Sequence, residues 1–411
     1  MDRRGSSLEE LPEHLICVGG GVIGMETASS FGKLGCKITV IELMEQLLPG
    51  TDPELVRPVQ QALKKSGATI HLGSKATALS EKGGKAVLTC EGPKGSFEVV
   101  GDKVMVSIGF RPNSKGLGLE QAGVKVSDRG FVTVDPACRT NVGHIYAIGD
   151  VTGMPFLAHR ATKMGVVAAE VIAGQPALCD WQAMPLGIFS DPEVAQVGLS
   201  EQEAKDAGHE VMVGKFPFAA LGRAMAQNST AGMVKVIGDA KSGILLGVGI
   251  VGPRANDLIA EAALALELGA AVETSRFTVH SHPTFAEGLF EAAEDALGHA
   301  IHVARPKRKT ALEKQSDQLL LKKVVSAGST RRPYRPPDAG PRGEARGPRR
   351  TAPSPARAAP TGCRRPPDPA RRPAATALPA ARPSSPALRW SARAGIAAVI
   401  ALSLLEALVG G

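Results

Sequence analysis

Residues 15–26 read Leu-Ile-Cys-Val-Gly-Gly-Gly-Val-Ile-Gly-Met-Glu, and this stretch decides the fold of the N-terminal part of the chain. An apolar run of strand type leads into Gly19, Gly21 and Gly24, which occupy the G-x-G-x-x-G positions, and helical spacing follows to about residue 34. The first glycine permits a tight turn, the second lets a pyrophosphate approach the backbone, and the third allows close helix–strand packing. The pattern predicts a dinucleotide at the helix N-terminus. The alternative is a glycine-rich turn in an unrelated parallel sheet.

A second apolar run, residues 37–41, ends at Glu42. An acidic residue at this distance from the glycines is expected to bind a ribose 2′-hydroxyl. Because a carboxylate would repel a 2′-phosphate, Glu42 predicts NAD in preference to NADP.

The pattern continues as a compact α/β unit. A helix near residues 53–66 is followed by short strands at 69–72, 86–90, 97–100 and 103–108, which indicates an antiparallel insert within a parallel sheet. Farther on, a strand ends at Gly149-Asp150. This places a carboxylate at the edge where α/β sheets bind ligands. Phe156 then opens a helix that runs to about residue 173.

From residue 181 the pattern changes to α+β. Strands at 211–216, 233–237 and 244–251 alternate with helices near 200–207 and 255–268, and a final helix is predicted over 289–302. Before that helix, residues 280–291 carry His282-Pro283 and, five residues after the histidine, Glu287. A helix entering there could place the carboxylate beside the imidazole, which would make His282 a general base near neutral pH. The alternative is that the His282-Pro283 segment is an ordinary turn without a catalytic role.

Composition separates the last hundred residues from the rest. Residues 304–411 hold 22 lysines and arginines against six acidic residues, and 16 of the 30 prolines. Such a segment buries too little apolar surface to offset chain entropy, so we expect a disordered basic, proline-rich tail. We expect the tail to be a solvated extension, or translated sequence with no selected role, in preference to a nucleic-acid-binding segment. Residues 395–411 are mostly apolar, but their length and Glu406 disfavour a membrane span.

The cysteines and the N-terminus indicate a cytoplasmic protein. No secretory signal precedes the first strand. No two of the six cysteines have C-x-x-C or C-x-x-x-x-C spacing, so neither a metal site nor a local redox pair is expected. Cys17 and Cys36 lie in or beside predicted strands and are expected to be buried thiols.

Taken together, these segments resemble the flavin-dependent disulfide reductases, that is, the pyridine nucleotide-disulfide oxidoreductase family. Within this family they resemble the dihydrolipoyl dehydrogenases most. The resemblance runs from about residue 11 to 303. It is carried by the motifs at 19–26, 109–113, 146–150, 157–159, 191–195, 217–224, 250–253 and 280–284. It implies an NAD-binding domain over 1–112, a partial FAD-binding domain over 113–180 and an interface domain for dimerisation over 181–303.

The resemblance also implies roles for single residues. The NAD site would comprise Gly19, Gly20, Gly21, Val22, Ile23, Gly24, Glu26, Glu42, Gly109 and, more weakly, Ala76. Asp150 would bind the sugar-phosphate chain of FAD, and Phe156, Leu157, Ala158 and His159 would lie near its isoalloxazine. His282, oriented by Glu287, would accept a proton in the active site of the other subunit of a homodimer.

One departure from the family is large. The family's first G-x-G-x-x-G and its C-x-x-x-x-C redox pair have no counterpart in this sequence. We therefore expect an incomplete form of an enzyme that passes electrons from dihydrolipoyl groups, through a disulfide and FAD, to NAD. The expected partner is the lipoyl domain of a 2-oxoacid dehydrogenase complex. The alternatives are a non-catalytic, NAD-binding, dimerising remnant and an NADH-dependent flavin reductase.

Overall fold

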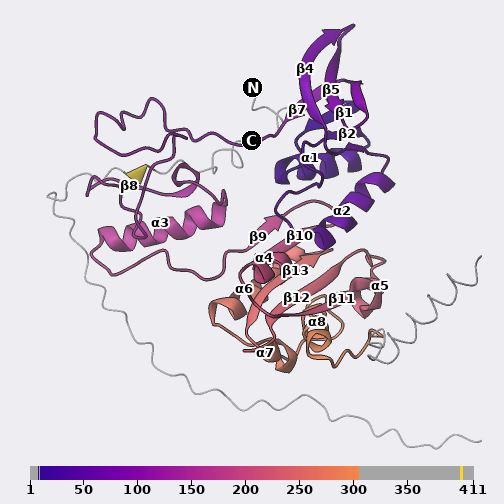
Figure 1. The fold of residues 1–411 in the computed structure, drawn as a ribbon, viewed down its shortest axis with the longest axis vertical. Coiled ribbons are helices and arrows are strands. Elements are labelled where there is room, and N and C mark those ends of the chain that lie inside the picture. Colours follow the sequence, from indigo (N-terminus) through magenta and orange to yellow (C-terminus); the bar gives the residue numbers. More distant parts are fainter. Residues whose placement is uncertain (1–7, 9, 305–398, 401–411) are drawn as a thin grey trace, which may run out of the picture. The chain divides into compact units, whose positions relative to one another are not determined.

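The computed structural model describes Leu8, residues 10–304 and a two-residue strand, β14 (Val399–Ile400). The disordered tail expected over 304–411 lies outside the described residues, apart from its first residue and β14. That strand pairs in parallel with β8 (Tyr146–Ala147). The expected fold class is confirmed, because an α/β unit is followed by an α+β domain (Figure 1).

The N-terminal unit is built on a parallel sheet in the order β3-β2-β1-β7. These strands are, in that order, Thr69–His71, Lys37–Ile41, His14–Val18 and Lys103–Val106. Two helices, α1 (Val22–Lys33) and α2 (Pro53–Lys65), connect the strands, and Figure 1 shows both beside the sheet. Asp52 begins α2 by accepting the N–H of Glu54 at 2.9 Å, with Pro53 in the first turn. The helix predicted near 53–66 is therefore confirmed.

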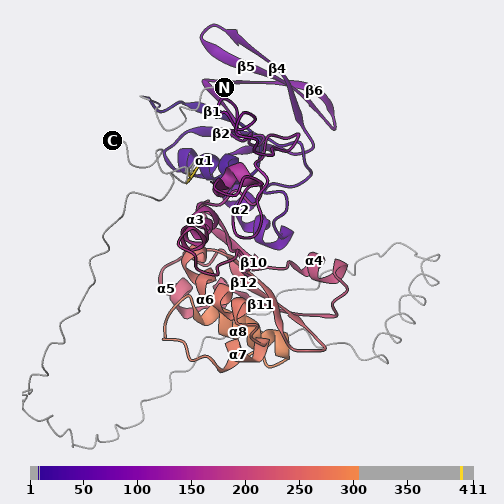
Figure 2. The ribbon, with the colours of Figure 1, turned by 90° about the vertical axis from the view of Figure 1, so that its left-hand side faces the viewer.

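Both faces of this sheet are covered, which explains why its strands read as continuous apolar runs. Leu15 and Cys17 of β1 pack with α1 and α2, whereas Ile16 and Val18 face the opposite way. The opposite face is covered by an antiparallel sheet in the order β4-β5-β6. Its strands, seen side by side in Figure 2, are Lys75–Lys82, Lys85–Gly92 and Gly95–Gly101.

The middle segment has little regular structure. It contains β8, the 3₁₀ turn η2 (Gly149–Thr152) and one long helix, α3 (Ala158–Ile172). The apolar side of α3 packs on the residues that flank β8. The helix expected to open at Phe156 begins two residues later, because Leu157 is still extended and serves as the N-cap.

The C-terminal domain is an antiparallel sheet in the order β11-β12-β13-β10-β9. The strands are, in that order, Val211–Pro217, Met233–Asp239, Leu245–Val251, Val194–Gly198 and Leu186–Ile188. The helices are α4 (Glu201–Asp206), α5 (Gly222–Ala226), α6 (Ala255–Glu267), α7 (Val272–Phe277) and α8 (Glu287–Leu297), with a 3₁₀ turn η3 (Phe218–Ala220). The final helix was wrongly placed at 289–302. It ends early because Gly298 adopts a left-handed conformation with φ of 94°.

The two faces of this sheet have different neighbours. Val248 and Ile250 of β13 point into a core shared with α6 and α8. Val251 points the other way and shares a core with α2. Gly249 lies on that second face, where an added Cβ would meet Leu55 of α2 at 2.5 Å. The close approach of α2 to β13 therefore requires glycine at this position.

Candidate functional site

The glycine turn joins β1 to α1 in the way the sequence predicts. Gly19 donates its N–H to Ile41 of β2 at 2.8 Å, and Gly21 is the N-cap of α1. The residues Val22 and Ile23 form the first turn of the helix, and Ile23 is exposed. Unpaired N–H groups at such a terminus attract a phosphate.

The three fingerprint glycines meet different surroundings. A Cβ at Gly19 would lie 2.4 Å from the carbonyl oxygen of Ser107, and φ there is +106°. A Cβ at Gly24 would lie 1.9 Å from the carbonyl oxygen of Gly19. A Cβ at Gly21, by contrast, would meet nothing within 4 Å. Two glycines thus allow the protein to pack against itself, and the third leaves open the space that a pyrophosphate would need.

Glu42 follows β2 directly and its carboxylate is held against the glycine turn. One oxygen accepts the N–H of Gly20 at 2.5 Å and the other accepts the N–H of Met44 at 2.7 Å. The side chain is buried. A carboxylate can accept about four hydrogen bonds, so both oxygens retain acceptor capacity for hydroxyl groups.

The structure places the remaining NAD-site candidates differently. Gly109 follows β7, has φ of +127°, and has open space where a Cβ would stand. The carboxylate of Glu26, in α1, accepts the N–H of Phe189 from the C-terminal domain at 2.8 Å. Ala76 lies in β4 and packs with the apolar cluster that includes Ile16. The carboxylate of Glu26 therefore contacts the C-terminal domain. Ala76 belongs to the antiparallel β4-β5-β6 sheet.

The middle segment holds the candidates for an FAD site. Asp150 lies in η2, where burial raises the pKa of its carboxyl and the Arg160 guanidinium opposes that rise. The ring of Phe156 is stacked on Phe131 and meets Phe110 edge-on, with centroids 5.9 and 5.5 Å apart. Leu157 and Ala158 begin α3, and Nε2 of His159 contacts the carbonyl oxygen of Pro185 at 2.8 Å.

Sequence reasoning missed the residue that orders this loop. Arg160 donates to the carbonyl oxygens of Gly153 at 2.9 Å and Pro155 at 3.3 Å, and to the hydroxyl of Thr152 at 3.1 Å. An arginine in the first turn of an apolar helix gave no signal in the sequence. The guanidinium holds the segment between Asp150 and α3 in one conformation.

The predicted contact between His282 and Glu287 is present. Nδ1 of His282 lies 2.7 Å from Oε1 of Glu287, while the imidazole is 77% exposed. The second carboxylate oxygen accepts the N–H of Thr284 at 2.6 Å. Burial alone would raise the pKa of Glu287, but the Thr284 N–H and the imidazole outweigh it and lower that pKa. Glu287 therefore remains ionised and fixes the ring from one side. The His282–Pro283 peptide is cis.

A second histidine lies two residues earlier in the same loop. Nε2 of His280 is 2.9 Å from Glu261 of α6, and its side chain is 7% exposed. The hydrogen bond to Glu261 raises the pKa of His280, against the effect of burial. His280 thus anchors the loop to α6, whereas His282 is directed to the solvent. Spacing alone did not separate the roles of these two histidines.

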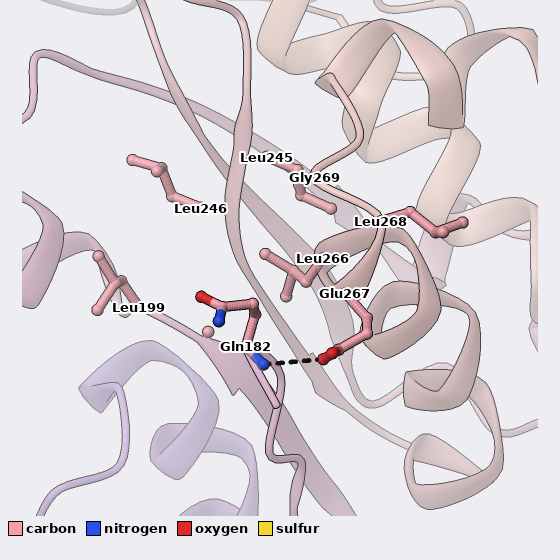
Figure 3. Close-up of a pocket in the computed structure, with 9 residues that line it drawn as sticks. Gln182, Leu199, Leu245, Leu246, Leu266, Glu267, Leu268 and Gly269 are labelled. Atoms are coloured by element: carbon pink, nitrogen blue, oxygen red, sulfur yellow. Dashed lines mark hydrogen bonds between the residues drawn. The ribbon is translucent and has the colours of Figure 1, made fainter. Parts of the chain in front are cut away.

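A pocket of about 540 Å³ lies elsewhere in the C-terminal domain, between the end of α6 and β13 (Figure 3). Most of its lining is leucine, and its one carboxylate, Glu267, already accepts the N–H of Gln182 at 2.9 Å. None of the predicted site residues lines it. Because polar groups do not converge there, we do not place the functional site in this pocket.

Neither a metal centre nor a membrane-spanning helix is found in the described part of the chain. No group of three or more histidine, cysteine or acidic side chains there is arranged to hold a metal ion. None of the described helices combines the length and apolar character that crossing a bilayer requires.

The chain belongs to the pyridine nucleotide-disulphide oxidoreductase family. Residues 1–165 match the model of that family, and residues 184–293 match the model of its dimerisation domain. The chain therefore carries a nucleotide-domain segment of this family followed by the family's dimerisation domain.

The chain is similar to curated proteins named dihydrolipoyl dehydrogenase. It is 46% identical to that of Haloferax volcanii over 72% of this chain and 62% of the relative. It is 42% identical to that of Geobacillus stearothermophilus over 74% of this chain and 65% of the relative. The chain thus spans somewhat less than two thirds of these relatives.

Solved structures of disulfide reductases are also similar to this chain. The flavoprotein disulfide reductase RclA of Escherichia coli superposes with a TM-score of 0.66 at 28% identity, covering 70% of this chain and 66% of that one. LpdA of Mycobacterium tuberculosis gives the same TM-score and identity over 71% and 63% of the two chains.

Proposed function

We propose that this chain supplies the NAD-binding, dimerisation and part of the FAD-binding portions of a dihydrolipoyl dehydrogenase-like oxidoreductase. The proposed limits are 1–112, 113–180 and 181–303. The observation that carries the proposal is the exposed imidazole of His282 held by the partly buried Glu287 at 2.7 Å. A nucleotide turn alone fits many reactions, but a histidine oriented by a carboxylate in the same chain supports proton transfer.

The geometry supports His282 as a general base. With Nδ1 directed at the carboxylate, the neutral ring carries its proton on Nδ1, and Nε2 is left with a lone pair. Nε2 accepts the proton of a dihydrolipoyl thiol, and Glu287 stabilises the imidazolium that forms. The resulting thiolate is the nucleophile for disulfide exchange.

The residues of the N-terminal unit fit NAD. The α1 N-terminus and the open space at Gly21 would take the pyrophosphate, and Glu42 would take the ribose hydroxyls. Val22, Ile23, Glu26, Gly109 and Ala76 complete the proposed site. When bound, NAD and FAD supply the hydride and electron transfer of the family's chemistry.

The fit to FAD is partial. Asp150 and residues 156–159 would contact one side of the flavin nucleotide. The C-x-x-x-x-C pair that the reaction also needs is not in this sequence. We propose that a polypeptide carrying that pair and the first nucleotide fold completes the enzyme. The complete assembly would be a homodimer in which His282 serves the partner subunit, and its substrate would be the lipoyl domain of a 2-oxoacid dehydrogenase complex.

Complementation tests this proposal. The full chain is co-expressed with the N-terminal third of the Geobacillus stearothermophilus relative, and NADH formation from dihydrolipoamide is followed at 340 nm. We expect activity from the co-expressed pair and none from either part alone. The matched control is the same pair with His282→Gln, which should assemble equally and turn over far more slowly.

The alternatives give different results. A non-catalytic remnant would bind NAD and assemble, yet would form no NADH in the complemented state. A flavin reductase would oxidise NADH with free flavin as acceptor, and His282→Gln would leave that rate unchanged. Either result would contradict the proposed reaction.

A further inference from the structure

Two cysteines that are far apart in the sequence meet in the middle segment. The Sγ atoms of Cys138 and Cys179, 41 positions apart, lie 3.5 Å from each other. Cys138 is fully buried, and Cys179 is partly exposed. Sequence spacing predicted no local redox pair, because the two residues share no motif and the fold alone brings them together.

The backbone holds both residues in register. Asp135 shapes the turn before Cys138 by accepting the N–H groups of Ala137 at 2.9 Å and Arg139 at 2.8 Å. Cys179 donates its N–H to the carbonyl oxygen of Pro136 at 2.7 Å. The two backbone segments are therefore hydrogen-bonded to each other next to the sulfurs. The contact follows from this pairing and not from a chance approach of two flexible side chains.

The packing around the pair is tight on one side and open on the other. Cys138 belongs to an apolar cluster with Tyr146, Met164 and Ala168, and its Sγ also lies 3.6 Å from the Met164 carbonyl oxygen. Cys179 lies at the margin of this cluster and provides access from solvent. A disulfide has an S–S distance of about 2.0 Å, so the sulfurs must approach by about 1.5 Å for a bond to form.

We propose that Cys138 and Cys179 are a redox site of this protein and form a reversible intramolecular disulfide on exposure to a hydroperoxide. The inference is independent of the proposed oxidoreductase reaction. It concerns different residues and needs neither NAD nor FAD.

The two thiols have distinct parts in the reaction. Burial raises the pKa of the Cys138 thiol to about 12, and its contact with Cys179 and the carboxylate of Asp135 add to the rise. Burial also raises the pKa of Cys179, as do Asp180 and Asp135, but the hydrogen bond from Cys138 acts against that rise, and the Arg160 guanidinium opposes the rise at both thiols. Cys179 therefore ionises first and is the attacking sulfur, and Cys138 is the resolving one.

The oxidation proceeds in two steps. The Cys179 thiolate attacks one oxygen of hydrogen peroxide, the O–O bond breaks, and a sulfenic acid and one water result once the released hydroxide is protonated. The Cys138 sulfur then attacks the Cys179 sulfur, the S–O bond breaks, and the hydroxide leaves as a second water with the Cys138 proton. Two thiols are oxidised and one hydroperoxide is reduced. Because both thiol pKa values are raised, the reaction should be slow at neutral pH and faster in alkali.

The bond would have a structural consequence. It would close a loop that contains Asp150 and α3, and it would tie the turn at 135–139 to the segment that leads to β9. A closed loop of this length limits the unfolded ensemble. We expect the oxidised chain to melt a few degrees higher than the reduced chain.

Peptide mapping of the full chain tests the proposal directly. The reduced protein is treated with hydrogen peroxide, its remaining thiols are alkylated, and it is digested with trypsin. Cys138 and Cys179 fall in the tryptic peptides 130–139 and 164–205, each of which contains one cysteine. We expect these two peptides to be linked and the thiol count to fall by two from the six cysteines of the chain. A dithiol reductant should restore both thiols.

Variants provide the matched controls. Cys179→Ser and Cys138→Ala should each abolish the link, whereas Cys36→Ser, which removes a buried thiol elsewhere, should keep it. The proposal is overturned if other cysteines are linked, or if Cys179 is oxidised to a sulfinic acid while Cys138 stays free. It is also overturned if all six thiols survive peroxide that oxidises a free thiol in the same tube. The wild-type map decides the matter even if a variant fails to fold.

Discussion

Nζ of Lys235 lies 2.8 Å from Oδ2 of Asp52, although 183 positions separate the two residues. Lys235 is on β12 of the C-terminal domain, and its side chain is 3% exposed. Its ammonium also meets Glu54 at 2.6 Å and Glu201 at 2.8 Å. Burial disfavours the charged form, but these three carboxylates outweigh it and raise the pKa of Lys235. One buried ammonium thus joins the N-terminus of α2 to the C-terminal domain.

Replacing Lys235 by methionine should destabilise the chain strongly. The variant leaves the buried Asp52 carboxylate without its cation, whereas Glu54 and Glu201 keep Lys215 and Lys205. Removing one partner of a buried ion pair costs roughly 3–5 kcal/mol. The measurement is the midpoint of urea unfolding, monitored by tryptophan fluorescence. Lys241→Met is the matched control, because that lysine is 76% exposed and should change little. Equal midpoints for Lys235→Met and wild type would show that the network contributes nothing to stability.

Glu201 should make part of the stability dependent on pH. Hydrogen bonds from Lys205 and Lys235 lower its pKa to about 2. A carboxyl whose pKa is lower in the folded state stabilises the fold above its unfolded pKa of about 4.3, and this contribution is lost as the pH falls toward the folded value. Wild type should therefore exceed Glu201→Gln in unfolding free energy at pH 7, and the gap should narrow between about pH 5 and pH 2. A gap that stayed constant over this range would contradict the assignment.

The fingerprint glycines should separate folding from nucleotide binding. Gly24→Ala forces a Cβ to within 1.9 Å of a carbonyl oxygen, so we expect a destabilised protein. Gly21→Ala meets no protein atom within 4 Å, so it should fold normally but bind NAD at least tenfold more weakly, since the methyl occupies the phosphate's space. Gly32→Ala, with its nearest atom at 3.5 Å, is the control for a mutation within α1. Normal NAD binding by Gly21→Ala would place the pyrophosphate elsewhere.

Glu42 should determine the choice between NAD and NADP. Titration of the full chain should give tighter binding of NAD, because the carboxylate repels a 2′-phosphate. Glu42→Arg should shift the preference toward NADP by replacing repulsion with attraction. Since the Glu42 carboxylate also binds the Gly20 N–H, Glu42→Gln distinguishes loss of that contact from loss of charge. Tighter binding of NADP by the wild type would refute the role given to Glu42.

His282 and Glu287 should differ in their effect on catalysis by the complemented enzyme. A positioned general base contributes roughly 10²–10⁴-fold in rate, so His282→Gln should lose about that much. Glu287→Gln keeps a hydrogen-bond acceptor but loses the charge, so its loss should be smaller. His144→Gln, an exposed histidine far along the chain from this loop, is the control. Full activity in His282→Gln would make the histidine structural.

Much of the fold could be read from local patterns. The strand before Gly19, the helix after it and the acid after β2 were all predicted, because period and turn chemistry are properties of short segments. The short elements β9, β10, α5 and α7 were not. Each has too few residues for a period to stand out. β9 and β10 are held by pairing within the five-stranded sheet, and α5 and α7 contact η3 and α8.

A second glycine run shows why pattern alone is insufficient. Gly247, Gly249 and Gly252 have the same G-x-G-x-x-G spacing, and α6 follows them. In the structure Gly247 and Gly249 lie inside β13, where a Cβ would meet Leu199 at 2.0 Å or Leu55 at 2.5 Å. These glycines admit neighbouring segments of the protein, whereas Gly21 leaves an open space. The difference is tertiary, since it depends on which atoms face the missing side chain.

The sequence by itself determined the nucleotide turn, Glu42 at the end of its strand, and the pairing of His282 with Glu287, because each depends on residues close together along the chain or on one strand–helix–strand unit. The tertiary structure decided the rest. It brought Lys235 to Asp52, Arg160 to the loop after Asp150, and Cys138 to Cys179. A long-range contact depends on how whole elements pack, and a lone lysine or cysteine in the sequence carries no information about which distant residue that packing will place beside it.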